Sequence, residues 1–188
     1  AILQWLGGIG IIVMAITLMP IMNVGGMQLF KISSNDQSEK ILPKSKTVAL
    51  RLVYIYSMLT IICTFFYKIF GMNFFDSITH AMTTIATGGF SNYNESIGFF
   101  NNKRIELIAT VFIILGSIPF ISYIKFLSGD KKIFINDSQI KSFIKIILIS
   151  LIILVLYLVF INKNFNEIGI ISLCFNVISI LSGTGYVT

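Results

Sequence analysis

The sequence predicts an all-α, polytopic membrane protein built from repeated units of a spanning helix, a half-length helix and a glycine-containing turn. Hydrophobic residues make up 55% of the 188 residues and charged residues only 12%, whereas a soluble domain carries about 25% charged residues. The apolar residues gather into runs of about 20, long enough to cross the hydrocarbon core of a bilayer. Two segments between these runs end in similar glycine-rich phrases.

Four apolar runs account for the expected membrane crossings. They cover residues 2–22, 48–70, 105–127 and about 143–161. The first continues weakly to residue 30, and Gly116 with Pro119 predicts a bend in the third. Polar, basic segments at 31–47 and 128–142 separate the runs, and we expect both to be loops.

A shorter helix is expected after each of two runs. Residues 73–87 mix apolar side chains with Asp76, His80 and several threonines. As a helix they would be roughly 22 Å long, too short to cross a bilayer, so we expect a re-entrant segment enclosed by protein or by a water-filled cavity. Asp76 is expected to interact with the positive end of the helix dipole, and His80 to be a polar packing residue bonded to nearby backbone.

A second half-length helix is expected over residues 168–182, and it aligns with the first without a gap. Residues 78–90 pair with residues 174–186, so that Thr83 meets Ser179, Gly89 meets Gly185 and Phe90 meets Tyr186. Internal repeats are typical of membrane transport proteins. Residues 1–30 therefore end a first repeat, 48–127 form a second, and 143–188 begin a third.

The basic residues predict the orientation of these repeats. Ten of the 14 Lys and Arg residues fall within 31–51 and 125–145, whereas Lys68, Lys103, Arg104 and Lys163 fall on the other side. The positive-inside rule places the two basic loops in the cytoplasm and both glycine turns outside. The net charge of +6 is thus a topology signal and implies no nucleic-acid partner, although the loops could also dock a cytoplasmic partner.

The two glycine turns have the composition of a backbone cation site. They are Thr87-Gly88-Gly89-Phe90 and Gly183-Thr184-Gly185-Tyr186. Glycine permits positive φ, which allows successive carbonyls to face one narrow path, and rings of carbonyls replace the hydration shell of potassium. We expect each turn at the outer end of its half-helix, with Phe90 and Tyr186 packed behind it. The alternative is that Gly-Gly forms only an interfacial turn.

The sequence shows no pattern of enzymatic chemistry. Cys63 and Cys174 lie in apolar stretches and are expected to be buried hydrophobic residues, and the sequence contains no metal-ligand cluster and no nucleophile–base pair. We therefore expect no enzyme activity and no cofactor, with potassium only as a transported ligand.

Four phrases together resemble one known family. They are QWLGGIGIIV (4–13), MPIMNVGGMQLF (19–30), FFDSITHAMTTIATGGFS (74–91) and FNVISILSGTGYVT (175–188). These are similar to the Trk/Ktr/HKT superfamily of potassium transporters, most closely its bacterial TrkH type. The resemblance implies potassium uptake across the bacterial cytoplasmic (inner) membrane through a carbonyl selectivity filter. It implies a pore helix at about 73–87, a filter at 87–91 and filter roles for Gly183, Thr184 and Gly185, with Gly183 standing where the family commonly has Thr or Ser.

The resemblance also implies how the whole protein is organised. Family members have four repeats around a central pore, form homodimers, and work with a cytoplasmic nucleotide-binding regulatory subunit. This chain would hold two of four filters, the first preceding Ala1 and the fourth following Thr188, and is not expected to conduct alone. Two alternatives are a secondary transporter whose broken helices bind another cation or solute at mid-membrane, and an accessory membrane subunit with re-entrant loops.

Overall fold

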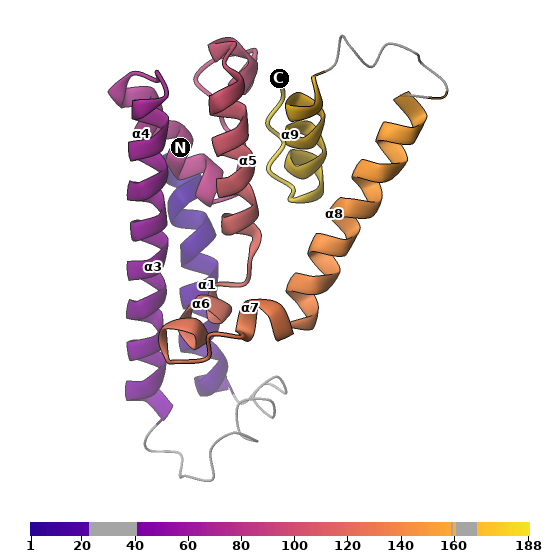
Figure 1. Cartoon of the computed structure of the whole chain (residues 1–188). Coiled ribbons are helices and arrows are strands. Elements are labelled where there is room, and N and C mark those ends of the chain that lie inside the picture. The colour runs from indigo at the N-terminus through magenta and orange to yellow at the C-terminus, as the bar shows by residue number, and fades with distance from the viewer. Residues whose placement is uncertain (23–40, 159, 161–168) are drawn as a thin grey trace.

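The computed structural model describes residues 1–22, 41–158, 160 and 169–188 (Figure 1). Within these ranges the chain is helical and contains no strand, which confirms the predicted all-α class. The elements in chain order are α1 (Ile2–Met22), α3 (Ile41–Ile69), α4 (Phe74–Ile85), the 3-10 helix η3 (Ser96–Phe100), α5 (Lys103–Ser117), α6 (Phe120–Leu127), α7 (Ile133–Asn136), α8 (Ser138–Tyr157) and α9 (Ile170–Leu181).

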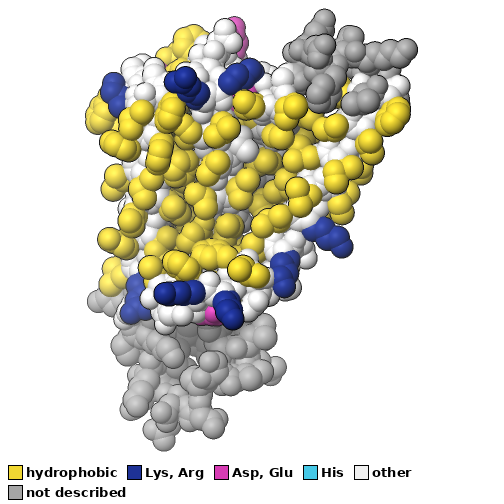
Figure 2. Space-filling model, in the orientation of Figure 1, with side chains coloured by type: hydrophobic (Ala, Val, Ile, Leu, Met, Phe, Trp, Pro, Cys, Tyr) yellow, Lys and Arg dark blue, Asp and Glu magenta, His cyan; other side chains and the backbone are white. Residues whose placement is uncertain are grey.

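Helices long and apolar enough to cross a membrane are present in the described ranges. Two qualify by length and composition, Thr47–Ile69 within α3 and Ser138–Tyr157, and α5 with α6 makes a third if the bent pair is one span. Figure 2 shows a broad hydrophobic band, with Lys and Arg side chains gathered at its two ends. This distribution fits a protein whose middle lies in hydrocarbon and whose ends lie at the two interfaces.

The third apolar run is broken rather than gently bent. The expected helix over 105–127 is two helices, α5 and α6, whose axes differ by 82°. Ile118 between them has an extended backbone (φ −71°, ψ 136°). A residue before proline is disfavoured in the α conformation because the proline ring clashes with it. Pro119 therefore keeps Ile118 out of the helix, and α5 ends at Ser117.

Two helices begin earlier than their apolar runs. The structure starts α3 at Ile41, inside the segment 31–47 expected to be a loop, and Pro43 lies in its first turn, where the missing amide has no helical partner to lose. Likewise α7 and the start of α8 occupy part of the expected loop 128–142. Asp137 caps α8 by accepting from the backbone N–H of Gln139 at 2.8 Å. A side-chain cap thus accounts for the early start of α8, and proline in the first turn is compatible with the early start of α3.

The two half-length helices lie among the longer ones (Figure 1). Helix α4 packs against α1, α3 and α5, and α9 packs against α5 and α8. The short helices α6 and α7 lie together at the lower end of the view. The core between these helices includes Cys63, which is fully buried as expected, whereas Cys174 is only partly buried.

Close packing of α5 on the end of α4 depends on Gly116. A Cβ at this position would lie 2.8 Å from the carbonyl oxygen of Ile85. We expect Gly116→Ala to lower the melting temperature of the purified protein, because forcing atoms into a packed contact costs about 1–3 kcal/mol, more than the gain of about 1 kcal/mol in helix propensity.

Gly10→Ala is the matched control. Gly10 is also helical, but a Cβ there would meet no atom within 4 Å. Its melting temperature should be unchanged or higher, and equal effects of the two substitutions would contradict the packing argument.

Candidate functional site

The two glycine turns adopt the same backbone conformation. Left-handed φ angles occur at Thr87 (48°) and its aligned partner Gly183 (75°), and again at Gly89 (66°) and its partner Gly185 (81°). Glycine adopts this region without steric cost. Threonine does so rarely, so Thr87 carries strain that Gly183 does not. The gap-free alignment of the two segments thus extends to their geometry.

Each turn is bonded back to its own half-helix in the same way. The hydroxyl of Thr83 donates to the carbonyl of Phe90 at 2.9 Å, and the hydroxyl of the aligned Ser179 donates to the carbonyl of Tyr186 at 2.8 Å. Both bonds join residues seven positions apart. The chain therefore reverses at the C-terminal end of each half-helix and runs back alongside it.

This reversal fixes the place of each turn on its half-helix. We expected the turns at the outer ends of the half-helices; in the structure each begins at the C-terminal end of its half-helix, which for α4 is the end away from the short connection to α3. The last turn of α4 lies against Gly116 near the break in α5, and Figure 1 shows the chain rising from the lower end of α9 to the C-terminus. The chain after the turn then reaches η3, where the N–H of Gly98 donates to the carbonyl of Val187 at 3.2 Å. Thr83 and Ser179 each lie two residues before the last residue of their half-helix, where their hydroxyls reach the returning strand.

The turn that follows α4 and the turn that follows α9 touch each other at Gly89. A Cβ on Gly89 would lie 1.8 Å from the carbonyl oxygen of Thr184 and 2.8 Å from its carbon. Both neighbours are backbone atoms, which cannot rotate away as a side chain would. Two separate constraints therefore favour glycine at position 89: the left-handed φ and the lack of space for a side chain beside the adjacent strand.

Tyr186 anchors the turn that follows α9 in the other half-helix, α4. Its side chain is fully buried, and its hydroxyl bonds to the hydroxyl of Thr83 and donates to the carbonyl of His80 at 3.2 Å. Tyr67 of α3 bonds to the adjacent Thr84 at 2.8 Å. The ring of Tyr186 thus packs behind its turn and joins two repeats.

Phe90, which aligns with Tyr186, differs from expectation. We expected it to pack behind its turn, but its side chain is 47% exposed. Tyr186 is held by the half-helix of the preceding repeat, and no half-helix precedes α4 among the described residues. Among the described residues, a buried site therefore encloses the side chain of Tyr186 but not that of Phe90.

Gln4 of α1 forms hydrogen bonds with the turn that follows α4. Its side-chain amide donates to the carbonyl of Gly88 at 2.8 Å and accepts from the N–H of Phe90 at 3.4 Å. A Cβ on Gly88 would lie 2.6 Å from this amide. This role of Gln4 was not predicted; its signal in the sequence is one polar amide within an apolar helix.

Asp76 does more than face a helix dipole. Its carboxylate, 2% exposed, accepts from the side-chain amide of Asn92 and the hydroxyl of Tyr93, both at 2.8 Å, and from the amide of Asn73 at 2.6 Å. Asn92 and Tyr93 follow the turn directly. Asp76 therefore clasps the returning chain to the first turn of α4.

His80 adds to this clasp. Its Nδ1 lies 2.9 Å from the backbone carbonyl of Asp76, which can only accept, so Nδ1 carries the proton. Nε2 then accepts from the hydroxyl of Ser91 at 2.9 Å. The expected bond to neighbouring backbone is present, and the bond to Ser91 was not foreseen.

Helix α9 begins against a buried carboxylate from another helix, α5. Ser172 holds the position in α9 that Asp76 holds in α4, and its hydroxyl donates to Glu106 of α5 at 2.8 Å. Glu106 is 3% exposed and pairs with Lys103 at 2.8 Å. This contact was not predicted, because Ser172 and Glu106 lie 66 residues apart in the sequence.

Comparisons with known proteins agree with one another. The TrkH family model, described as a cation transport protein, matches residues 1–187. The Trk system potassium uptake protein TrkI of Halomonas elongata is 36% identical over 98% of this chain and 38% of its own length. The Trk system potassium uptake protein TrkH of Escherichia coli is 34% identical over 99% of this chain and 39% of its own length.

A solved structure has the same fold. The crystal structure of the potassium transporter TrkH from Vibrio parahaemolyticus matches with a TM-score of 0.80 at 30% identity, over 98% of this chain and 37% of that one. This chain spans about two fifths of the length of the curated relatives it matches.

The Tyr186 anchor is testable by a double-mutant cycle. We expect Tyr186→Phe and Thr83→Val each to cost about 1–3 kcal/mol, because each leaves a buried polar partner unsatisfied. Since the two hydroxyls bond to each other, the double variant should lose less than the sum, by a coupling energy of about 0.5–3 kcal/mol. Thermal unfolding of the purified protein measures all three.

Tyr54→Phe is the control, because Tyr54 is 66% exposed. It should leave the melting temperature unchanged, and additive effects at Tyr186 and Thr83 would contradict the proposed anchor.

Proposed function

Because this chain belongs to the TrkH family of cation transport proteins, we propose that it forms part of a potassium uptake protein in which residues 87–90 and 183–186 are two strands of a selectivity filter. The family is one of membrane transport proteins and not of enzymes. Potassium is then the transported ligand, and no covalent step is required of any residue.

One observation carries this proposal. The two turns share their left-handed positions and their hydroxyl-to-carbonyl bonds, and they touch through Gly89 and the carbonyl of Thr184. Two strands with one conformation, side by side, are what a ring of backbone carbonyls needs. An interfacial turn would need neither the contact nor the shared conformation.

The half-helices favour a cation electrostatically. Each turn begins at the C-terminal end of α4 or α9, where unpaired carbonyls carry a partial negative charge. We propose that the carbonyls of Thr87, Gly88 and Gly89, with those of Gly183, Thr184 and Gly185, replace water around potassium. Phe90 and Tyr186 complete the strands, and Tyr186 fixes the strand of residues 183–186 to α4. Uptake would follow the membrane potential, worth about 2.3 kcal/mol per charge per 100 mV.

The whole pore requires more than this chain. Two strands cannot surround an ion, and the chain spans about two fifths of the relatives' length. We propose four filters, two of them here, and a homodimer that works with a cytoplasmic nucleotide-binding subunit. The relatives' names place them in a Trk system, which fits a multicomponent assembly.

We further propose that the protein lies in the bacterial inner membrane with its filters facing outward. The basic segments 31–51 and 125–145 would then be cytoplasmic. Helices α6 and α7, which carry part of the second basic segment, lie together at one end of the molecule, opposite the short connection between α3 and α4 (Figure 1).

Gly89→Ser tests the filter. A serine Cβ would overlap the carbonyl of Thr184, and a left-handed backbone adds about 1–2 kcal/mol of strain. We expect the full-length gene to rescue growth of a potassium-uptake-deficient bacterium at low potassium. The variant should take up rubidium about tenfold more slowly or more and discriminate less against sodium.

Gly169→Ser is the matched control. Gly169 is the N-cap of α9, with φ −54° and open space around its Cβ position, and serine is a favoured N-cap. This variant should behave as the parent. Unchanged selectivity in Gly89→Ser would contradict the placing of Gly89 in the filter.

A further inference from the structure

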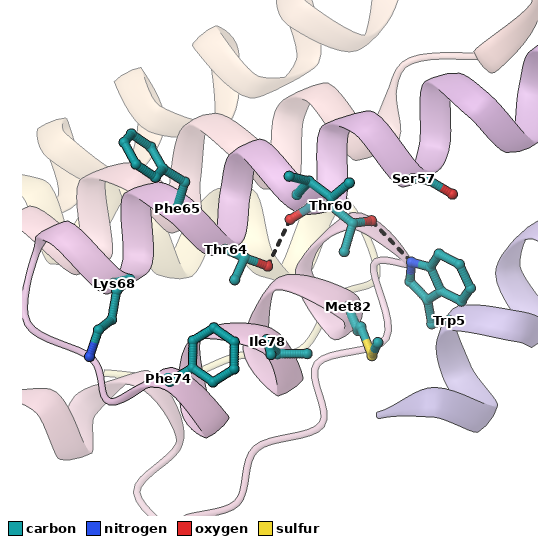
Figure 3. Close-up of a pocket in the computed structure, with 10 residues that line it drawn as sticks. Trp5, Ser57, Thr60, Thr64, Phe65, Lys68, Phe74, Ile78 and Met82 are labelled. Atoms are coloured by element: carbon teal, nitrogen blue, oxygen red, sulfur yellow. Dashed lines mark hydrogen bonds between the residues drawn. The ribbon is translucent and has the colours of Figure 1, made fainter.

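An apolar groove runs between α3 and α4 and ends at α1 (Figure 3). Its volume is about 550 Å³, within the range of ligand pockets, about 300–1,000 Å³. One wall is a face of α4 formed by Phe74, Ile78 and Met82, and the other is a face of α3 that includes Ile61 and Phe65. Ile61, Phe65 and Phe74 are each more than 60% exposed. In a membrane protein, this surface meets lipid unless another element covers it.

The polar residues in the groove do not make it polar. Thr60 donates to the carbonyl of Tyr56 at 2.9 Å and accepts from the indole N–H of Trp5 at 3.0 Å. Thr64 donates to the carbonyl of Thr60 at 2.9 Å. Their hydroxyls are satisfied within the protein, so they add little polarity to the groove. The cavity therefore favours a hydrocarbon chain over a polar solute.

The length of the groove matches one leaflet of a bilayer. Along α3 it extends from Ser57 to Lys68, which is roughly 16 Å at 1.5 Å per residue. The hydrocarbon core is about 30 Å thick, so the groove covers about half of it. An acyl chain that starts at the interface near Lys68 would follow the groove to the middle of the membrane.

Lys68 supplies a charge at the interfacial end. It lies next to the last residue of α3, at the opposite end of the groove from Trp5 (Figure 3). The described part of the chain gives its ammonium group no carboxylate partner. A basic side chain at the rim of an apolar groove complements a phosphate above an acyl chain.

We propose that this groove binds one anionic phospholipid, with an acyl chain between α3 and α4 and the head-group phosphate at Lys68. The lipid would contact the face of α4 that carries Met82. The adjacent residues Thr83 and Thr84 face the opposite way and bond Tyr186. A bound lipid would thus support from behind the half-helix that holds both turns, independently of which ion the turns select.

Native mass spectrometry of the full-length protein tests this site, with dioleoyl phosphatidylglycerol as the probe and dioleoyl phosphatidylcholine for comparison. We expect Lys68→Gln to weaken the tightest phosphatidylglycerol adduct about fivefold, the effect of losing one basic residue near an anionic lipid. Ile61→Trp fills the groove without changing charge, and it should weaken the adducts of both lipids.

Arg104→Gln is the charge-matched control. Arg104 is an exposed cation that does not line the groove, and in the predicted topology it lies on the same side of the membrane as Lys68. It should leave phosphatidylglycerol binding unchanged. Equal binding by the parent, Lys68→Gln and Ile61→Trp would overturn the proposal.

A photoreactive side chain at position 61 distinguishes the possible occupants. Cross-linking to phosphatidylglycerol in vesicles made of both lipids would support the proposal. Cross-linking to another segment of the protein would show that protein fills the groove, and would overturn it.

Discussion

The hydrogen bond from a half-helix hydroxyl to the carbonyl seven residues later is the interaction on which this structure depends. Non-helical backbone is tolerated at membrane depth only where protein or water satisfies its polar groups. Thr83 and Ser179 meet part of this need by holding the returning strands at Phe90 and Tyr186. These two bonds fix the direction in which each strand leaves its turn.

The same elements connect one repeat to the next. The ring of Tyr186 belongs to the third repeat, but its hydroxyl bonds to residues of α4 in the second repeat. Glu106 of α5 receives Ser172 of α9, and the carbonyl of Thr184 fills the space that a side chain on Gly89 would need. The position of each proposed filter strand is therefore set by its neighbour as well as by its own helix. A ring of carbonyls that replaces the hydration shell of an ion needs neighbouring strands held beside one another.

Local rules predicted the helical class and the half-helices better than they predicted the helix boundaries. Apolar run length and glycine pattern pointed to the half-helices, and the pairing of Thr83 with Ser179 matches an equivalent hydrogen bond in each repeat. The early start of α8 follows from its cap at Asp137, whose local effect outweighed polar composition. Contacts such as Gln4 with Gly88, or Glu106 with Ser172, join residues far apart in sequence, so no local pattern reveals them. The direction of each returning strand follows from hydrogen bonding, which composition does not show.

Anomalous diffraction from rubidium-soaked crystals of the full-length protein tests the central claim most directly, because rubidium substitutes for potassium and its position can be measured. The account predicts anomalous peaks bounded by the backbone oxygens of residues 87–89 and 183–185. Peaks lying only among side chains, for example at the helix break near Pro119, would contradict the claim that these two turns form part of the ion path.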